Sequence, residues 1–288
     1  MTQRLMTEQD LSLTQASHAV GLAKSSWYYQ SHPRPPRPLN AGLVAAIEAL
    51  WSKTRGVYGY RKVHALLRVH GFVVNHKAVL RHLRRLDRLQ PRKLKGVRWT
   101  RPRIVHPTAS NTYWETDLTY VWCGSGFGYL FAVIDAYDKG VPGACFGDRC
   151  RAVEAVQALE EAVASRFGDR VPDGHTLTLR VDRGSQFIAC RFQEAAKALG
   201  VTLEYAGIQC PDDKPYIESF FGHYKTEEVY RTSYRTLAEG QVGWQLYRIW
   251  YETERIHESL GYQTPQQRLG EAVSMKTAYH KTCGEVTR

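Results

Sequence analysis

Three acidic residues of this chain have the types and settings that metal-dependent phosphodiester chemistry requires. Asp117 lies in the run W-E-T-D-L-T-Y, Asp182 in V-D-R-G-S-Q-F, and Glu218 in Y-I-E-S-F-F. Mg²⁺ prefers oxygen ligands and binds through few protein carboxylates together with a substrate phosphate. Two such ions about 3.5–4 Å apart can activate the attacking oxygen and stabilise the leaving one. We therefore expect the three carboxylates to be catalytic and to hold two Mg²⁺ ions.

Two of these carboxylates are expected at one edge of a β-sheet. Residues 113–122 alternate as a strand does, with Asp117 on the same face as Glu115. Asp182 directly follows a second predicted strand at residues 177–181. If the two strands are neighbours, both aspartates emerge close together. The nearest other acidic residues are predicted to be structural: Glu115, Asp135 and Asp138.

The third carboxylate is predicted on a helix that begins near Asp213. Asp212 or Asp213 is expected to cap this helix, which places Glu218 in its second turn. Lys225 follows Glu218 by seven residues, which is two turns and about 10 Å along the same helix face. Gly222 lies between them and would let a DNA backbone approach closely.

The order of predicted elements is typical of an α/β, ribonuclease-H-like core, a mixed five-stranded sheet with flanking helices. Small all-α modules of helix-turn-helix type precede it. The predicted elements are strands at 113–122, 129–137 and 141–148, a helix at 152–167, a strand at 177–181, a helix around 187–199, a strand at 201–205, a helix from 213 and a helix at 234–251.

Composition shifts along the chain indicate several modules joined by basic linkers. We predict a helix-turn-helix-like segment at 1–31, a Pro-rich linker at 32–39, a helical DNA-binding module at 40–89, a basic linker at 90–110, the catalytic core at 111–270 and a tail at 271–288. The first segment either reads DNA sequence or is a remnant of a larger module.

Charge and cysteine usage restrict the class of protein further. The formal net charge of +11 favours a polyanionic partner, because each neutralised phosphate releases counterions. Six scattered cysteines show no zinc-type spacing and are expected to be reduced. No apolar stretch approaches the roughly 20 residues that a membrane span needs. These features predict a cytoplasmic, nucleoid-associated bacterial protein.

The three acidic motifs resemble the catalytic boxes of a known family. They are similar to those of the second-frame subunit (OrfB) of IS-three family insertion-sequence transposases, which are related to retroviral integrases. G-V-Y-G-Y-R-K-V at 56–63 and Y-E-T-E-R-I-H-E-S-L-G-Y-Q-T-P at 251–265 extend the resemblance to about residues 50–270. The chain departs from the family pattern at Arg180-Val181 and at Lys214-Pro215-Tyr216, where relatives often show an Asn-Ala or Asn-Gly pair.

The resemblance implies a D-D-E polynucleotidyl transferase. Asp117, Asp182 and Glu218 would bind Mg²⁺ (or Mn²⁺), and Lys225 would contact DNA near the scissile phosphate. The partners would be double-stranded DNA, both transposon terminal repeats and target DNA, and further copies of the chain. An upstream-frame product (OrfA) is a further implied partner.

Several other residues are candidates for DNA contacts, each with a plainer alternative. Tyr58, Tyr60, Arg61 and Lys62 either contact DNA or pack the helical module. Arg101 and Arg103 either touch phosphates or belong to a solvated linker, and Arg255 and His257 either contact DNA or close a helix end on the core. The complete set of expected DNA-binding residues is Lys225, Arg183, Tyr58, Tyr60, Arg61, Lys62, Arg101, Arg103, Arg255 and His257.

The expected function is a DNA transposase that cleaves transposon ends and transfers them to target DNA without a covalent protein intermediate. One alternative is a ribonuclease-H-type nuclease that hydrolyses DNA without strand transfer. Another is a catalytically inactive DNA-binding regulator of transposition. A tyrosine or serine recombinase is disfavoured, because the sequence offers no nucleophile within an arginine cluster.

Overall fold

The computed structural model describes residues 1–29, 38–91, 104–124, 126–207 and 213–271. The chain forms two compact units, Met1–Ala41 and Gly42–Arg288. Arg101, Arg103 and Asp212, which carry sequence predictions, lie outside the described residues. No helix within the described residues is long and apolar enough to cross a bilayer.

The first unit contains three short helices, α1 (Thr2–Glu8), α2 (Leu13–Val20) and α3 (Lys24–Tyr28). Ser12 and Gln15 form a reciprocal capping box at the start of α2. Gly21 ends α2 with a φ of 68°, which glycine adopts without strain. The predicted helix pair around Gly21 is therefore present. The preceding helix α1 was not predicted.

The second unit begins with three helices, α4 (Ala41–Lys53), α5 (Tyr60–Val69) and α6 (His76–Arg85). Their apolar faces pack together through buried side chains that recur at helical spacing. This cluster also contains Tyr58, which packs against Trp250 of the C-terminal half at a ring separation of 6.3 Å. The helices of residues 41–85 thus share a hydrophobic core with the C-terminal half. The buried hydrophobic residues of the three helices are Leu43, Ile47, Leu50, Val63, Leu67, Val79 and Leu83.

A five-stranded sheet forms the centre of this unit, in the order β3-β2-β1-β4-β5. The strands are β1 (Tyr113–Trp122), β2 (Phe127–Asp135), β3 (Gly143–Gly147), β4 (Thr178–Val181) and β5 (Thr202–Tyr205). The first three pair antiparallel, whereas β4 pairs parallel to both β1 and β5. This arrangement confirms the predicted ribonuclease-H-like fold with a mixed five-stranded sheet.

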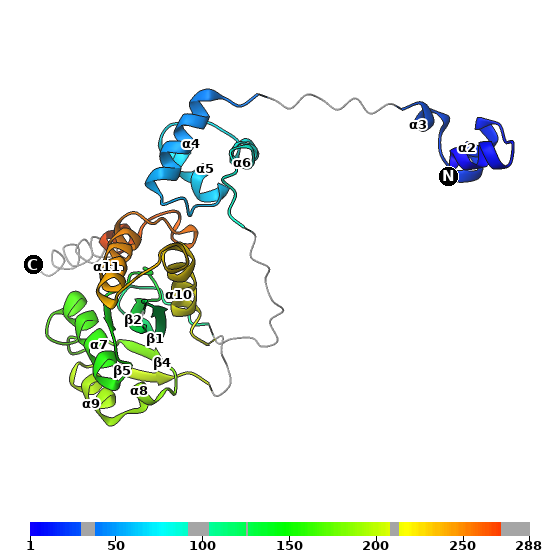
Figure 1. The fold of residues 1–288 in the computed structure, drawn as a ribbon. Coiled ribbons are helices and arrows are strands. Elements are labelled where there is room, and N and C mark those ends of the chain that lie inside the picture. The colour runs from blue at the N-terminus through cyan, green and yellow to red at the C-terminus, as the bar shows by residue number, and fades with distance from the viewer. Residues whose placement is uncertain (30–37, 92–103, 125, 208–212, 272–288) are drawn as a thin grey trace, which may run out of the picture. The chain divides into compact units, whose positions relative to one another are not determined.

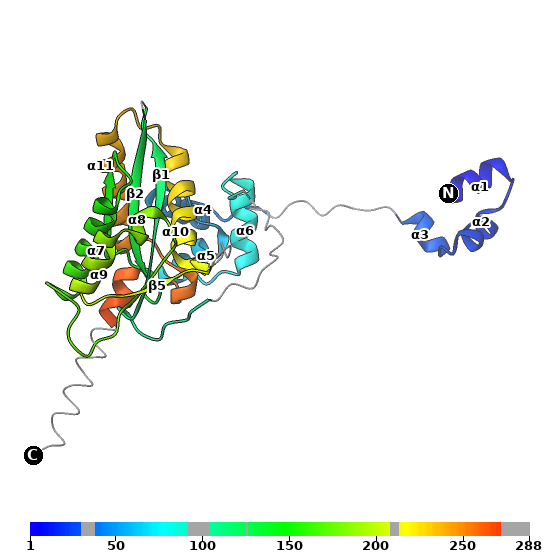
Figure 2. The same ribbon diagram turned by 90° about the horizontal axis from the view of Figure 1, so that it is seen from below.

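Helices cover both faces of the sheet (Figures 1 and 2). On one face, α7 (Ala152–Phe167) and α9 (Cys190–Ala198) pack on Trp114, Phe131 and Val133. On the other, α10 (Pro215–Glu227) packs on β1 and β2, and α11 (Leu237–Thr253) packs on α10 through aromatic contacts. The short helix α8 (Ser185–Ile188) follows β4.

The start of α10 differs from the prediction. The helix begins at Pro215 and its N-cap residue is Lys214, so Glu218 lies in the first turn rather than the second. Asp213 does not cap it, because its carboxylate instead accepts the backbone N–H of Gly207 at 2.9 Å. Proline at the first helical position is favourable, since its missing N–H would have no helical partner.

Candidate active site

The parallel pairing of β1 with β4 brings two of the predicted carboxylates together. Glu115 of β1 is level with Arg180 of β4. Two residues further along each chain, Asp117 and Asp182 therefore leave the sheet side by side. Asp117 lies within β1, whereas Asp182 directly follows β4. The sequence expectation that these two strands are neighbours is confirmed.

A single lysine ammonium lies between these two carboxylates. The Nζ atom of Lys214 is 3.0 Å from Oδ2 of Asp117 and 3.5 Å from Oδ2 of Asp182. The Lys214 side chain is only 6% exposed, compared with 24% for Asp117 and 43% for Asp182. Both aspartates thus direct an oxygen at one buried position that holds a positive charge. Sequence reasoning noted Lys214 only as a departure from the family pattern.

Neighbouring backbone contacts fix both aspartates and the lysine. Oδ1 of Asp117 accepts the backbone N–H of Leu118, and Oδ1 of Asp182 accepts that of Gly184, both at 2.8 Å. Each aspartate therefore keeps its second oxygen for the cation position. Lys214 also donates to the carbonyl oxygen of Thr116 at 3.3 Å.

Arg180 holds the segment that precedes α10 against the sheet. Its guanidinium is buried, donates to the carbonyl oxygen of Asp213 at 2.9 Å and pairs with Glu204 at 3.0 Å. Because Lys214 follows Asp213 directly, this contact sets where its side chain enters the site. Arg180, the other departure from the family pattern, therefore has a positioning role in this chain.

Glu115 holds the first turn of α10. Its Oε2 atom accepts the backbone N–H groups of Tyr216 and Ile217, both at 2.9 Å. Burial raises the pKa of Glu115 to about 7, although these hydrogen bonds and the nearby Arg180 act in the opposite direction. Glu115 is thus structural, as predicted.

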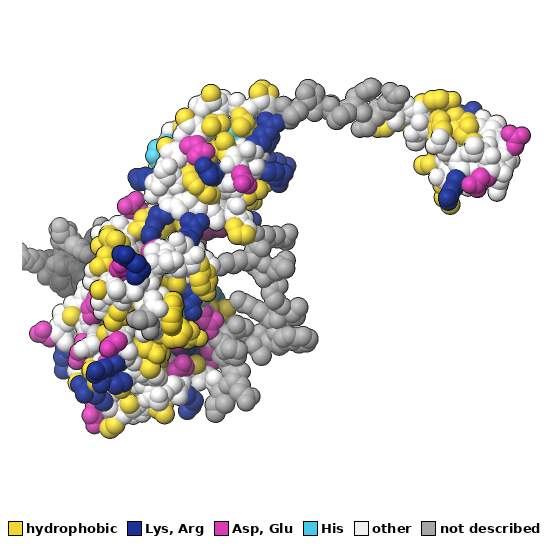
Figure 3. All heavy atoms as spheres, in the orientation of Figure 1, with side chains coloured by type: hydrophobic (Ala, Val, Ile, Leu, Met, Phe, Trp, Pro, Cys, Tyr) yellow, Lys and Arg dark blue, Asp and Glu magenta, His cyan; other side chains and the backbone are white. Residues whose placement is uncertain are grey.

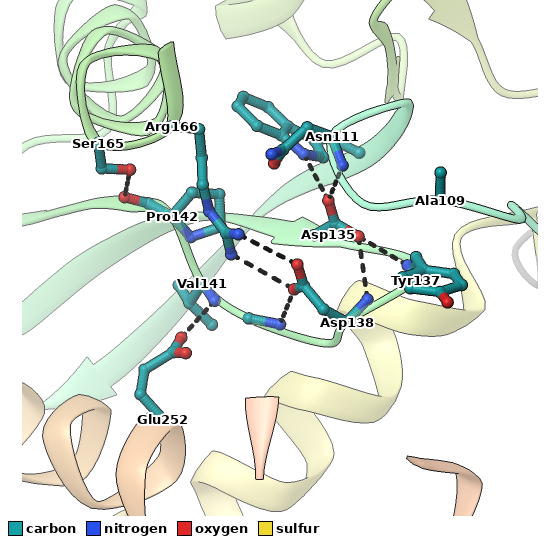
Figure 4. Close-up of polar contacts among 12 residues, drawn as sticks. Ala109, Asn111, Asp135, Tyr137, Asp138, Val141, Pro142, Ser165, Arg166 and Glu252 are labelled. Carbon is teal, nitrogen blue, oxygen red and sulfur yellow. Dashed lines mark hydrogen bonds and ion pairs between the residues drawn. The ribbon is translucent and has the colours of Figure 1, made fainter. Parts of the chain in front are cut away.

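The other two structural acids, Asp135 and Asp138, form a separate network on the loop after β2 (Figure 4). Asp135 accepts the backbone N–H of Asn111 at 2.6 Å and the Trp114 indole N–H at 3.0 Å. Asp138 is buried and pairs with Arg166 of α7 at 3.1 Å. Their oxygens are occupied by this loop, by α7, and by Asn111 and Trp114 at the start of β1.

Glu218 does not form a group of metal ligands with the two aspartates in this conformation. Its side chain is exposed in the first turn of α10. Within the described ranges, no group of three or more His, Cys, Asp or Glu side chains is arranged to hold a metal ion. The two aspartates therefore offer a cation position between them, and the ammonium of Lys214 lies there.

Lys225 and Gly222 lie further along α10. The Nζ atom of Lys225 is 5.3 Å from the ring centre of Tyr120 on β1. A Cβ atom added at Gly222 would meet no protein atom within 4 Å, so this part of the helix surface is open. Arg183, next to Asp182, is exposed and lies 5.6 Å above the Tyr205 ring.

Three of the residues expected to contact DNA are buried. Tyr58 is 1% exposed, and its hydroxyl accepts the backbone N–H of Ile256 at 2.9 Å. Arg255 is 2% exposed and forms two hydrogen bonds of 2.8 Å with Glu227. His257 stacks edge-on against Tyr251, and burial lowers its pKa. In this conformation all three pack the core, which is the alternative that the sequence left open.

Three other described candidates, Tyr60, Arg61 and Lys62, lie nearer the surface. Arg61 is exposed, and Tyr60 is half-buried. Lys62 lies 4.7 Å from the ring centre of Tyr58, and burial lowers its pKa to about 7. Lys62 lines a cavity of about 790 Å³ between α5, α10 and the segment after α11. Arg255 and His257 line the same cavity, so the structure brings Lys62 together with a pair that the sequence analysis treated separately from it.

A further basic surface, on α6, was missed by sequence reasoning. This helix reads H-K-A-V-L-R-H-L-R-R, and Lys77, Arg84 and Arg85 are exposed on it. Figure 3 shows Lys and Arg side chains gathered on one side of the helical module. The signal was present in the sequence as basic residues on the polar face of an amphipathic helix.

Comparison with known families accounts for most of the chain. Residues 107–211 and 199–265 match the integrase core domain, and residues 38–95 match an HTH-like domain. Together these matches include the three carboxylates and the helical module. The chain is also 28% identical over 261 residues to the "Insertion element IS407 uncharacterized 31.7 kDa protein" of Burkholderia multivorans, covering 90% of each.

The integrase core matches, which together span residues 107–265 and therefore more than half of the chain, decide the assignment together with a named relative. The chain is 28% identical over 271 residues to the "Putative transposase for insertion sequence element IS986/IS6110" of Mycobacterium tuberculosis, covering 88% of this chain and 95% of the relative. The chain belongs to the insertion-element transposases. The IS-three family resemblance is thereby confirmed, and the transposase is a polynucleotidyl transferase with an integrase core.

The fold of the transposase is similar to that of one chain in a solved viral complex. It aligns with a chain from the cryoEM structure of the simian T-cell lymphotropic virus intasome in complex with PP2A regulatory subunit B56 gamma. The TM-score is 0.50 and the identity 18%, over 77% of the transposase and 74% of that chain. At this identity, the likeness concerns the fold.

Proposed function

We propose that the transposase cuts the ends of its insertion element and joins them to target DNA at Asp117, Asp182 and Glu218. The observation that carries this proposal is the convergence of the two aspartates on one cation position at the edge of the sheet. A one-to-one surface salt bridge would argue against a metal site. Here one buried ammonium is shared by two carboxylates, which is the arrangement expected where a divalent cation can bind.

The proposed residues act mainly by positioning. Asp117 and Asp182 would hold the first ion with their Oδ2 atoms, because their Oδ1 atoms are engaged by backbone amides. Glu218 would complete the site from the first turn of α10. When bound, two Mg²⁺ or Mn²⁺ ions activate the attacking oxygen and neutralise charge on the phosphodiester. Lys225 and Arg183 flank the site and would orient the DNA backbone.

The basic surfaces outside the core would bind the terminal repeats. We propose that exposed Lys77, Arg84 and Arg85 on α6 contact DNA phosphates, together with Arg61 and Tyr60 on α5. Arg101 and Arg103 remain proposed phosphate contacts from the linker. For Tyr58, Lys62, Arg255 and His257, a direct DNA contact would require partial opening of the packed core.

The wider assembly is also a proposal. Joining two DNA ends to one target favours a homo-oligomer, and an upstream-frame (OrfA) product would add further DNA contacts. Acting on chromosomal DNA places the transposase in the bacterial cytoplasm, associated with the nucleoid. Analytical ultracentrifugation with and without terminal-repeat DNA tests the assembly, since a chain that stays monomeric on DNA contradicts it.

The proposed function is tested by incubating the protein with pre-cut terminal-repeat DNA, target DNA and Mg²⁺ or Mn²⁺. We expect joined products with wild type and their loss in Asp117→Asn, Asp182→Asn and Glu218→Gln. Asp173→Asn is the matched control, because Asp173 is exposed and forms an ion pair with Arg170 at the surface. Hydrolysis without joining would support the nuclease alternative, and full activity of Asp182→Asn would refute the assigned site.

A further inference from the structure

We propose that Lys214 is a built-in counter-cation of the Asp117–Asp182 pair, which the first divalent ion has to displace. The ammonium would keep the two carboxylates together while no metal is bound. Its departure would then be a required step of metal loading. This inference rests on the proposed function, because it concerns the same two aspartates.

The contacts of Lys214 favour this role over that of an ordinary buried lysine. Its ammonium touches both aspartates and the carbonyl oxygen of Thr116, and its side chain is almost fully buried. Two adjacent carboxylates without a cation repel each other. The single charge of Lys214 relieves that repulsion but leaves the cluster of three groups with one net negative charge, which still attracts a divalent ion.

The lysine and a divalent ion cannot share the position. Mg²⁺ binds oxygen ligands at about 2.0–2.1 Å and holds them in a nearly octahedral arrangement. An ammonium offers no lone pair, so it cannot become a ligand. It also repels a cation placed a few ångströms away. The Oδ2 atoms now directed at Nζ are those that the ion would use, so binding of one excludes the other.

The position of Lys214 in the chain allows such an exchange. The residue lies between the Asp213 carbonyl held by Arg180 and the first turn of α10 held by Glu115. The backbone on both sides is therefore fixed, while the aliphatic part of the side chain can rotate. The ammonium can leave the carboxylates without unfolding the start of α10.

The test measures Mn²⁺ binding to the full chain without DNA, by titration calorimetry, and thermal unfolding in the absence of metal. Lys214→Met removes the charge and keeps the approximate length, whereas Lys214→Arg keeps the charge. Lys139→Met is the matched control, because Lys139 is a partly buried lysine that donates to the Ala136 carbonyl oxygen rather than to an acidic residue. Lys214→Gln replaces Lys214→Met if the latter does not fold.

A neighbouring cation changes the proton affinity of a carboxylate by about one to three orders of magnitude. By the same attraction, we expect Mn²⁺ to bind at least about tenfold more tightly to Lys214→Met than to wild type. Metal-free Lys214→Met should unfold at a lower temperature than metal-free wild type. Added Mn²⁺ should raise the unfolding temperature of Lys214→Met by more than it raises that of wild type. Lys139→Met and Lys214→Arg should not bind Mn²⁺ more tightly.

Unchanged or weaker Mn²⁺ binding by Lys214→Met would overturn the inference. If Asp117→Asn still abolished Mn²⁺ binding in that case, the proposed function would stand and only the inference about Lys214 would fall. Mn²⁺ binding that survives intact in both Asp117→Asn and Asp182→Asn would overturn the metal site itself. The two failures are therefore distinguishable.

Discussion

The Oε2 atom of Glu115 accepts the backbone N–H of Ile217 at 2.9 Å, which joins the strand that carries Asp117 to the helix that carries Glu218. The first N–H groups of a helix have no partner within the helix, so an acceptor on another element stabilises its start. Here the acceptor comes from about a hundred residues earlier in the chain. The bond therefore fixes two parts of the candidate site relative to each other.

Removing this bond should weaken both stability and activity. Loss of a side-chain cap costs about 0.5–2 kcal/mol, so we expect Glu115→Ala to lower the free energy of unfolding by at least that range. Glu115→Gln keeps an oxygen acceptor and should retain most of the stability. Denaturant unfolding and a strand-transfer assay measure the two effects.

The matched control is Thr236→Ala, because the Thr236 hydroxyl accepts the backbone N–H of Glu239 at 3.2 Å and caps α11. It should lower stability while leaving more strand transfer in the folded protein than Glu115→Ala does. Equal activity losses in the two variants would show that the link to Ile217 has no specific role.

Gly222→Ala should affect the stability of α10 and the activity on DNA in opposite directions. Gly222→Ala adds a Cβ atom that meets no protein atom within 4 Å, in the interior of α10. Alanine favours a helix over glycine by about 1 kcal/mol, so stability should rise. If the DNA backbone approaches this surface, strand transfer should fall despite the gain.

Gly270→Ala is the control, since Gly270 is also helical and an added Cβ atom there also meets no protein atom within 4 Å, but it lies near the end of the described chain. It should gain stability without losing activity. Retention of wild-type strand transfer by Gly222→Ala would exclude close contact of DNA at this position.

The buried pair of Arg255 and Glu227 is expected to act on folding rather than on DNA affinity. Removing one partner of a buried ion pair costs about 3–5 kcal/mol, because the other charge stays buried. Arg255→Ala should therefore lose stability by roughly that amount. The folded fraction should bind terminal-repeat DNA as wild type does.

Equilibrium unfolding and DNA binding by fluorescence anisotropy measure these two properties. Arg235→Ala serves as the control, because Arg235 forms an exposed ion pair with Glu239. This substitution should change the free energy of unfolding only slightly. An Arg255→Ala protein with normal stability but weak terminal-repeat binding would favour the DNA-contact alternative.

Lys62 should make the free energy of unfolding depend on pH in the range from about 7 to about 10. Burial lowers its pKa to about 7 in the folded state, whereas the unfolded chain binds the proton up to about pH 10.4. Between these values the unfolded state binds more protons, so the free energy of unfolding rises with pH. Lys62→Met removes this contribution and should give a flatter curve between pH 7 and about 10.

Denaturant unfolding at several pH values checks this expectation, with Lys53→Met as the exposed lysine control. Lys62→Met should also be more stable than wild type near neutral pH. A pH dependence identical to that of wild type would mean that Lys62 reaches solvent in the folded protein.

Local patterns in the sequence were sufficient to predict helices and strands of the core and to recognise its acidic motifs. The limits of β1 and α7 agree with the predicted ranges 113–122 and 152–167. Alternation and helical spacing of apolar residues are properties of neighbouring residues, so they can be read without the fold. The same holds for the acidic motifs and for their resemblance to insertion-sequence transposases.

The tertiary structure alone decided which groups meet. Lys214 reads in the sequence as one cation among 39 Lys and Arg residues, and only the pairing of β1 with β4 shows that it lies between two aspartates. Glu115, rather than Asp213, holds the start of α10, and Arg255 is buried rather than exposed. These outcomes depend on contacts between residues far apart in the chain. A lysine, glutamate or arginine side chain has the same charge and hydrogen-bonding groups wherever it occurs in the sequence. Its role in this protein follows from the partners beside which the fold buries it.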